Sequence, residues 1–197
     1  MGQDSEALSV FAKAFAEHLE VVAETQAQLP VLEAIANAMI ATISAGRKIL
    51  WCGNGGSAAD SQHLAAELVG RFQRDRRGLA SIALTTDTSI LTAIGNDLGF
   101  DRVFSRQVEA IGRPGDLLVG MTTSGNSPNV ILALETARGL KLTTVAFTGL
   151  GGGKTAQLVD HLFAVPSRNT ARIQEAHTLA GHLICDWVEF KTLQPAG

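Results

Sequence analysis

KILWCGNGGSAAD, residues 48–60, is the stretch that decides the fold. It opens with a run that is apolar after Lys48 and shows no polar alternation, which is typical of a strand buried on both faces of a parallel sheet. A loop of glycines and asparagine follows, and Ser57 and Asp60 form a capping-box-like pair that predicts the start of a helix. The order of strand, loop and helix returns in DLLVGMTTSGNSPNV, residues 116–130. Two such units predict an open α/β sheet that binds its ligand outside the carboxyl ends of the strands.

The rest of the chain alternates short apolar runs with helical stretches. Apolar residues recur at helical spacing over 5–28 and 31–46, on either side of Pro30, and again from about Thr170 to Leu193. The five expected strands are Lys48–Cys52, Ala80–Leu84, Asp116–Met121, Leu142–Phe147 and His161–Val165. The predicted fold class is therefore α/β, with a doubly wound, mainly parallel five-stranded sheet between two helical layers and additional N-terminal helices.

Length and composition limit the possible functions. A chain of 197 residues suits one domain, 1–197, with helices in 1–46 and an α/β core with the C-terminal helix in 47–197. The net charge of −3 gives no basic footprint for nucleic acid, and no apolar run reaches the roughly 18 residues of a membrane helix. The acidic N-terminus has no signal-peptide profile, and Cys52 and Cys185 are expected to be free, buried thiols. We therefore expect a cytoplasmic protein that binds neither nucleic acid nor membranes.

The loop TTSGNSP is a candidate phosphate site. Its four hydroxyls belong to Thr122, Thr123, Ser124 and Ser127. Ser127 is a good N-cap, and Pro128 falls at the first helical position, where a missing N–H costs nothing. Hydroxyls and free amides at a helix N-terminus favour an anion, and a sugar phosphate fits better than a nucleotide because the GxxxxGK[ST] pattern is absent. The alternative is that these residues only form a turn and a cap.

The earlier loop, GNGGS at 53–57, fits a polar sugar contact better than a dinucleotide. Its glycines let the backbone approach a ligand closely. The segment does not match GxGxxG, and no acidic residue follows at the ribose-binding distance. The basic run RFQRDRRG at 71–78 is read either as a solvated loop after a helix or as a device for steering phosphate.

Two predicted helices carry the residues that can do chemistry. His63 and Glu67 are four residues apart and share one helix face. On the last helix, Gln174, Thr178 and His182 also recur at spacings of four. The opposite side of that helix is the expected apolar seam, formed by Ile173, Ala176, Ala180, Leu183 and Trp187. Because the Gln174–His182 stripe has no charge of the kind that a solvated face carries, we expect another part of the chain to cover it.

These polar residues fit either a metal site or unrelated polar pairs. Gln174 and His182 lie about 12 Å apart along a helix axis, a distance that two side chains leaning together just span. With His63 and Glu67 they would supply two imidazoles and two oxygens, a set that suits zinc. The alternative is two ordinary polar pairs on separate helices. Without metal, a carboxylate and imidazoles still provide the base and acid that moving a carbonyl through an enediol requires.

Several ordered motifs give the chain a family resemblance. They are CGNGGSAADSQHLAAEL (52–68), TAIGNDLGF (92–100), FSRQVEA (104–110), TSGNSPN (123–129) and RIQEAH (172–177) with His182. On these motifs the chain resembles the phosphoheptose isomerases of the sugar-isomerase (SIS) domain superfamily. The resemblance implies a SIS-type fold and an aldose–ketose isomerase that converts sedoheptulose 7-phosphate to D-glycero-D-manno-heptose 7-phosphate, for the heptose of lipopolysaccharide core or other surface glycans. It also implies homotetramers with active sites between subunits.

The resemblance further implies roles for individual residues. Glu67 and His182 correspond to the acid/base pair, and one zinc ion per subunit is expected. The implied zinc ligands are His63, Glu67, Gln174 and His182. The implied substrate contacts are Asn54, Gly55, Gly56, Glu67, Asn96, Asp97, Thr122, Thr123, Ser124, Ser127 and Gln174. Some members carry an aspartate just before RIQE, where this chain has Ala171, and GND at 95–97 also reads as a plain turn.

Other functions are open to a chain of this family. One relative is a non-catalytic tetrameric adaptor that binds the replication initiator, but it lacks the counterparts of Glu67 and His182 that are present here. A phosphosugar-binding regulator would usually carry an attached DNA-binding domain, which no segment here supplies. A different phosphosugar isomerase activity is the remaining alternative.

Overall fold

The computed structural model describes residues 2–193, with side chains from Glu6 onward. Its strands are β1 (Ile49–Gly53), β2 (Ser81–Ala83), β3 (Leu117–Thr122), β4 (Thr143–Thr148) and β5 (His161–Ala164). They form one sheet in the order β2-β1-β3-β4-β5, and all four pairings are parallel. The predicted five-stranded parallel sheet is confirmed, and each strand end lies within one residue of its expected position.

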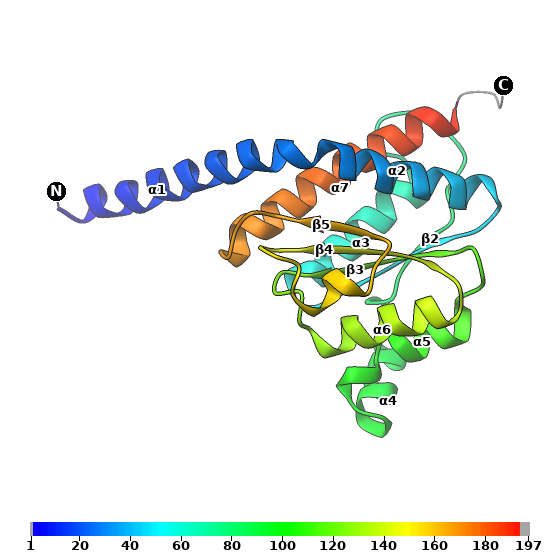
Figure 1. Cartoon of the computed structure of the whole chain (residues 1–197). Coiled ribbons are helices and arrows are strands. Elements are labelled where there is room, and N and C mark those ends of the chain that lie inside the picture. The colour runs from blue at the N-terminus through cyan, green and yellow to red at the C-terminus, as the bar shows by residue number, and fades with distance from the viewer. Residues whose placement is uncertain (1, 194–197) are drawn as a thin grey trace.

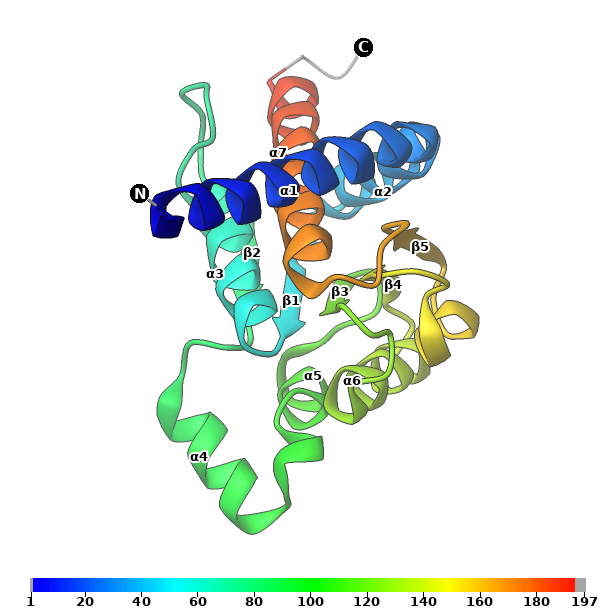
Figure 2. The same cartoon turned by 90° about the vertical axis from the view of Figure 1, so that its left-hand side faces the viewer.

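Helices cover both faces of the sheet in three layers (Figure 1). The bounds on one side are α1 (Gly2–Thr25), α2 (Leu29–Ser44), α3 (Gly56–Val69) and α7 (Thr170–Thr192), with the 3-10 turn η1 (Gln26–Gln28) between α1 and α2. The bounds on the other side are α4 (Thr88–Asp97), η2 (Phe100–Arg102), α5 (Ser105–Ile111), α6 (Pro128–Gly139) and η3 (Gly153–Gln157). Figure 2 shows α1 crossing over α7, and α4 projecting from the opposite side of the sheet.

The core lies on both sides of the sheet, which explains the absence of polar alternation. Ile49 and Trp51 of β1 pack with α2, α3 and α7, whereas Leu50 and Cys52 pack with α5 and α6. Every residue of β1 and β3 is buried. Cys52 and Cys185 are free and buried as predicted, and burial raises the pKa of each thiol to about 12.

The strand order creates a topological switch point between β1 and β3. The chain winds from β1 outward to β2, and then from β3 outward in the other direction to β5. The two loops that follow β1 and β3 therefore leave neighbouring strands for opposite faces, since α3 and α6 lie in different layers. This is the place where open α/β sheets bind ligands.

The N-terminal helices differ in how far they are built into the core. Pro30 lies in the first turn of α2, close to the predicted break. By length and composition the helical run Glu6–Ser44 could cross a membrane, which we did not predict. Within this run, however, α2 contributes side chains such as Ile35 and Met39 to the core that it shares with the sheet and α7. One third (33%) of the most apolar window of this run is buried, and the remainder is open to the outside of the chain.

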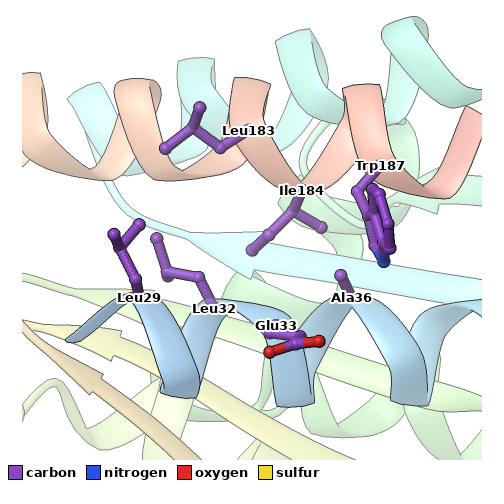
Figure 3. Close-up of a pocket in the computed structure, with 7 residues that line it drawn as sticks. All are labelled: Leu29, Leu32, Glu33, Ala36, Leu183, Ile184 and Trp187. Atoms are coloured by element: carbon purple, nitrogen blue, oxygen red, sulfur yellow. The ribbon is translucent and has the colours of Figure 1, made fainter. Parts of the chain in front are cut away.

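The apolar face of α7 is rotated from the predicted one. Ile173, Ala176 and Ala180 are buried as expected, but Leu183 and Trp187 are 47% and 37% exposed. Ile184 and Val188 are buried in their place, because continuing the spacing of four after Ala180 keeps the stripe facing the sheet. Leu183 and Trp187 instead line a groove of about 320 Å³ between α7 and α2 (Figure 3).

Candidate active site

Helices α3 and α7 lie side by side along one regular line of contacts, the α3–α7 seam. The seam consists of Gly56, Asp60 and His63 of α3 facing Gln174, Thr178 and His182 of α7. A Cβ at Gly56 would collide with the Gln174 amide, so glycine here lets the Gln174 side chain lie directly against the start of α3. The uncharged stripe of α7 is therefore covered by α3, as predicted.

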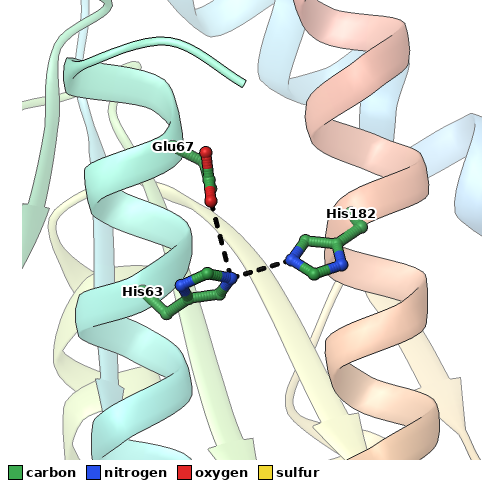
Figure 4. A group of neighbouring side chains, drawn as sticks. All are labelled: His63, Glu67 and His182. Carbon is green, nitrogen blue, oxygen red and sulfur yellow. Dashed lines mark hydrogen bonds and ion pairs between the residues drawn. The ribbon is translucent and has the colours of Figure 1, made fainter. Parts of the chain in front are cut away.

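Three titratable side chains converge at the His63–His182 end of this seam (Figure 4). His63 Nε2 lies 2.8 Å from His182 Nε2 and 3.6 Å from Glu67 Oε1. We call His63, Glu67 and His182 the triad; their ligand atoms all lie within 4.8 Å of one another. The Phe72 ring stacks on His182 at a centroid distance of 5.3 Å. The side chains of His63 and Glu67 are 46% and 21% exposed, so a ligand from solution can reach them.

The triad fits a divalent metal such as zinc. Two imidazole nitrogens and a carboxylate oxygen form a donor set that zinc takes, with one position left for another ligand. The two Nε2 atoms point at each other, an arrangement in which a protonated nitrogen on both rings would be repulsive. The fourth implied ligand, Gln174, lies against Gly56, about 10 Å along the helix axis from His63. Three of the four implied ligands are thus together, and Gln174 is further along the seam.

Asp60 was expected to cap α3 and does not. The N-cap is Gly55, whose φ of 54° suits glycine, and Ser57 lies inside the helix. The Asp60 carboxylate turns to α7, where Thr178 Oγ1 donates to Oδ1 at 3.1 Å, and Oδ2 is buried without a partner among the described residues. Burial raises the pKa of Asp60, although the Thr178 hydrogen bond and the charges of His63 and His182 oppose the rise. Asp60 is a seam residue that we did not predict.

The loop after β3, residues 122–127, is called the hydroxyl loop. Thr122 Oγ1 lies 2.9 Å from Ser127 Oγ and 3.4 Å from Ser124 Oγ, so three of its hydroxyls form one cluster. Ser127 is the N-cap of α6 and Pro128 follows at its start, as predicted, but the Ser127 side chain makes no cap hydrogen bond. The hydroxyls therefore point at one another at the start of a 12-residue helix, where free amides favour an anion.

The loop after β1, residues 53–56, is called the glycine loop, and it is tied to α6. Asn54 and Asn129 exchange two side-chain hydrogen bonds of 2.9 Å, each Nδ2 donating to the other Oδ1. Gly55 and Gly56 follow Asn54 in the sequence, and both are exposed. Asn129 was not predicted to be in the site, since an asparagine in the first turn of a helix gives no signal of a long-range partner.

Asn96 and Asp97 lie on α4, so the alternative reading of GND as a plain turn is wrong. Asp87 caps α4 by accepting from the Ile90 N–H at 2.9 Å, and the helix continues through Gly95 to Asp97, shortly before Gly99 with its φ of 92°. Asn96 Nδ2 donates to Asp97 Oδ1 at 2.7 Å, and both residues are exposed. No residue of α4 is buried, and the helix packs chiefly on η2 rather than on α3 or α7. Their role in substrate binding stays a prediction.

The arginine-rich loop after α3 is largely exposed, as the solvated-loop reading expects, but Arg76 is built into the protein. Arg76 has a side chain only 3% exposed, and it donates to the Glu67 and Leu68 carbonyls at 2.8 Å, at the end of α3. Its Nε pairs with Glu189 Oε1 of α7 at 3.1 Å. The reading of a solvated residue is therefore wrong for Arg76, and phosphate steering by the other arginines stays a prediction. We call Arg76 and Glu189 the anchor.

Glu189 is held in its charged form at this anchor. Its carboxylate accepts the backbone N–H groups of Phe72, Gln73 and Arg74 at 2.8–3.0 Å. Burial alone would raise the pKa of Glu189, but these hydrogen bonds and the Arg76 charge hold the pKa below its usual range. A lone glutamate at an inward position of a helix was the signal in the sequence that we missed.

His177 is a second buried residue that we did not predict as functional. Its Nε2 lies 3.0 Å from the Thr148 carbonyl at the end of β4, and the ring packs against Phe147 and Phe163. Burial lowers the pKa of His177 to about 4, so the ring is neutral near pH 7. It joins α7 to the carboxyl edge of the sheet.

Known proteins are similar to this chain in sequence and in fold. The profile of the SIS domain family matches residues 10–149. A phosphoheptose isomerase of Akkermansia muciniphila is 58% identical over 158 residues, covering 80% of this chain and 84% of that protein. One of Aliarcobacter butzleri is 54% identical over 182 residues, covering 92% of this chain and 96% of that protein.

A solved structure is similar over nearly the whole chain. The structure of phosphoheptose isomerase GmhA from Neisseria gonorrhoeae is 47% identical, covers 93% of this chain and 99% of that chain, and has a TM-score of 0.89. The TM-score shows that the fold described above is also that of this solved protein. The chain belongs to the SIS domain family.

Proposed function

We propose that this chain is a phosphoheptose isomerase, which converts sedoheptulose 7-phosphate to D-glycero-D-manno-heptose 7-phosphate. The observation that carries the proposal is the convergence of Glu67 and His182 from two helices at a seam that begins beside the glycine loop. Relatives named phosphoheptose isomerase, 54–58% identical over most of the chain, support the same reaction. The product supplies heptose for lipopolysaccharide core or other surface glycans.

The reaction needs a base and an acid on one substrate carbon pair. A base removes a proton from C1 of the ketose while an acid protonates the oxygen at C2, which gives an enediol. Returning a proton to C2 and removing one from the C1 hydroxyl gives the aldose, so atoms and protons balance. Glu67 and His182 serve as this pair, and such positioned groups contribute typically about 10²–10⁴-fold. Glu67 and His182 are both partly exposed, which lets substrate enter, and the Phe72 ring stacks on His182.

The substrate is held by the loops at the switch point. The hydroxyl loop and the N-terminus of α6 bind the phosphate, since three clustered hydroxyls and free amides suit an anion. The glycine loop contributes Asn54, Gly55 and Gly56 to the sugar hydroxyls. Gln174 lies beside Gly56 and extends this contact toward the triad. Because α4 packs on η2 rather than on α3 or α7, Asn96 and Asp97 are proposed to contact the substrate at an active site between subunits.

We further propose one zinc ion per subunit, held by His63, Glu67 and His182 together with Gln174. The 2.8 Å approach of the two Nε2 atoms beside a carboxylate supports the site. Gln174 would have to leave Gly56 to join them. A bound zinc ion polarises a carbonyl and stabilises negative charge on its oxygen. Elemental analysis should find about one divalent ion per chain and less in His63→Ala, and full activity after chelation would exclude this role.

We propose a homotetramer that acts in the cytoplasm, with residues 1–46 used for assembly and without a nucleic-acid or membrane partner. Apolar residues line one side of α1, and they are 60–72% exposed: Leu8, Phe11, Phe15 and Leu19. The α2–α7 groove in Figure 3 offers a matching apolar surface. Light scattering should show a tetramer that Phe15→Asp weakens and the exposed-site control Lys13→Ala does not. A wild-type monomer at micromolar concentration would contradict the assembly.

The reaction is tested by incubating the protein with sedoheptulose 7-phosphate and following the product by NMR. Appearance of the aldose 7-phosphate with the wild type, and its loss with Glu67→Gln, is the expected result. A folded wild type that leaves the substrate unchanged would contradict the proposed function. It would return the non-catalytic adaptor and other phosphosugars to consideration.

A further inference from the structure

The amide pair of Asn54 and Asn129 crosses the topological switch point. Asn54 follows β1, and Asn129 is the second residue of α6, which follows β3. Each side chain donates Nδ2–H to the other Oδ1 at 2.9 Å, so two hydrogen bonds join the glycine loop to α6. Asn129 is 3% exposed, whereas Asn54 is half-buried. Asn129 thus holds the pair in the core, and Asn54 remains accessible to a ligand.

Counting donors and acceptors shows what the pair leaves available. A carboxamide has two N–H groups and an oxygen with two lone pairs. The pair uses one N–H and one lone pair of each residue, so Asn54 keeps one N–H and one lone pair for another partner. Turning over one amide alone would place nitrogen against nitrogen and oxygen against oxygen. Asn129 therefore fixes the direction in which the free groups of Asn54 point.

We propose that Asn129 is a positioning residue for the sugar phosphate: its paired amide sets the spacing between the glycine loop and the hydroxyl loop and orients Asn54 toward the sugar. The inference rests on the proposed function and extends it to a residue without a direct chemical role. The hydroxyl loop ends two residues before Asn129, so the phosphate end of the substrate is fixed from the same turn. The glycine loop continues to Gly56, which contacts Gln174 of the seam. Asn129 thereby fixes the position of the phosphate-binding hydroxyl loop relative to Gly56, where the seam that carries the triad begins.

A purely structural role makes a different prediction from a positioning role. If the pair only keeps the hydroxyl loop folded, its loss weakens every ligand of that loop, including inorganic phosphate. If the pair positions the sugar, its loss weakens the sugar phosphate but leaves inorganic phosphate almost unaffected, because phosphate alone needs only the hydroxyl loop and α6. Comparing the two ligands separates the roles.

The test uses Asn129→Leu, which keeps the side-chain volume and removes both hydrogen bonds, with Asn37→Ala on the exposed face of α2 as control. Loss of two hydrogen bonds is expected to weaken ligand binding about tenfold or more. We expect the KM for sedoheptulose 7-phosphate to rise about tenfold, with kcat reduced less. The inhibition constant of inorganic phosphate should stay within about twofold of wild type, and Asn37→Ala should change none of these quantities. Asn54→Ala combined with Asn129→Leu should be no worse than Asn54→Ala alone.

Two outcomes would overturn the inference. Unchanged kcat and KM in Asn129→Leu would show that the spacing does not depend on the pair. An equal weakening of inorganic phosphate and of the sugar phosphate would show a structural role only. If the wild type turns over no heptose phosphate, the proposed function fails separately. In that case calorimetry still tests the inference, since Asn129→Leu must weaken binding of sedoheptulose 7-phosphate and leave binding of inorganic phosphate unchanged.

Discussion

The triad and the anchor are two carboxylate sites on the same pair of helices, and they differ in how completely the protein satisfies the charge. Glu189 is fully buried and receives three backbone N–H groups and Arg76. Glu67 is 21% exposed and has His63 at 3.6 Å. A carboxylate whose partners are all supplied by the chain is a structural element, since it has little capacity left for a ligand. A carboxylate with open capacity beside two imidazoles is placed for chemistry.

The largest effect is expected where this difference is broken at the triad. Glu67→Gln keeps the size of the side chain and removes its charge and its basicity. We expect turnover of sedoheptulose 7-phosphate to fall about 10²–10⁴-fold, with a melting temperature close to wild type. The measurement is NMR turnover beside thermal unfolding. A variant with near-normal turnover would remove Glu67 from the acid/base pair, and His182→Gln tests the partner in the same way.

The reverse result is expected at the anchor. Glu189→Gln leaves Arg76 buried with a neutral partner and weakens the three backbone hydrogen bonds. Breaking a buried charge pair typically costs about 3–5 kcal/mol of unfolding free energy. Denaturant titration measures the loss, while kcat per folded molecule should change only a few-fold. A large fall in kcat without loss of stability would place Glu189 in the catalytic machinery and erase the distinction.

The sequence reveals one side of this comparison better than the other. The strands were predictable because burial on both faces leaves an unbroken apolar run, as in Leu117–Thr122. The stripe of Gln174 and His182 was recognisable because it lacks charge. The anchor was not predictable, because Glu189 and its partner Arg76 are 113 residues apart and follow no periodic pattern.

The same limit applies to the candidate site. The loop hydroxyls were identified from composition and helix capping alone, whereas for His63 and His182 the sequence left a metal site and two separate polar pairs open, and family resemblance favoured the metal site. Asn129 and Asp60 were missed because their contacts, to Asn54 and Thr178, cross between separate elements. The rotation of the apolar face of α7 was missed because a spacing of three or of four fits a helix equally well after Ala180. Only packing against the sheet decides between them.

A smaller effect should appear as pH dependence at His177, which lies on α7 but outside both sites. Its pKa is about 4 in the folded chain and 6.5 in the reference state, so the unfolded chain binds a proton in that window and the folded chain does not. Stability should therefore fall as the pH drops from about 6.5 to 4, by roughly 3 kcal/mol. His177→Gln keeps a donor for the Thr148 carbonyl but does not titrate. Denaturant titrations of both proteins at several pH values should show a shallower fall in the variant, and parallel curves would contradict the assignment.

The smallest effect is expected at Thr178, which lies one turn of α7 before His182, on the far side of the triad from the anchor. Thr178→Val keeps the shape of the side chain and removes the hydrogen bond to Asp60 Oδ1, whose second oxygen already lacks a partner among the described residues. Loss of this donor should cost about 1–2 kcal/mol of unfolding free energy, and Thr178→Ser should restore most of it. If kcat falls by more than the stability loss explains, the middle of the seam works with the triad, because Asp60 then acts through the charges of His63 and His182. If only stability falls, Asp60 and Thr178 are structural residues of the seam, as Arg76 and Glu189 are at the anchor.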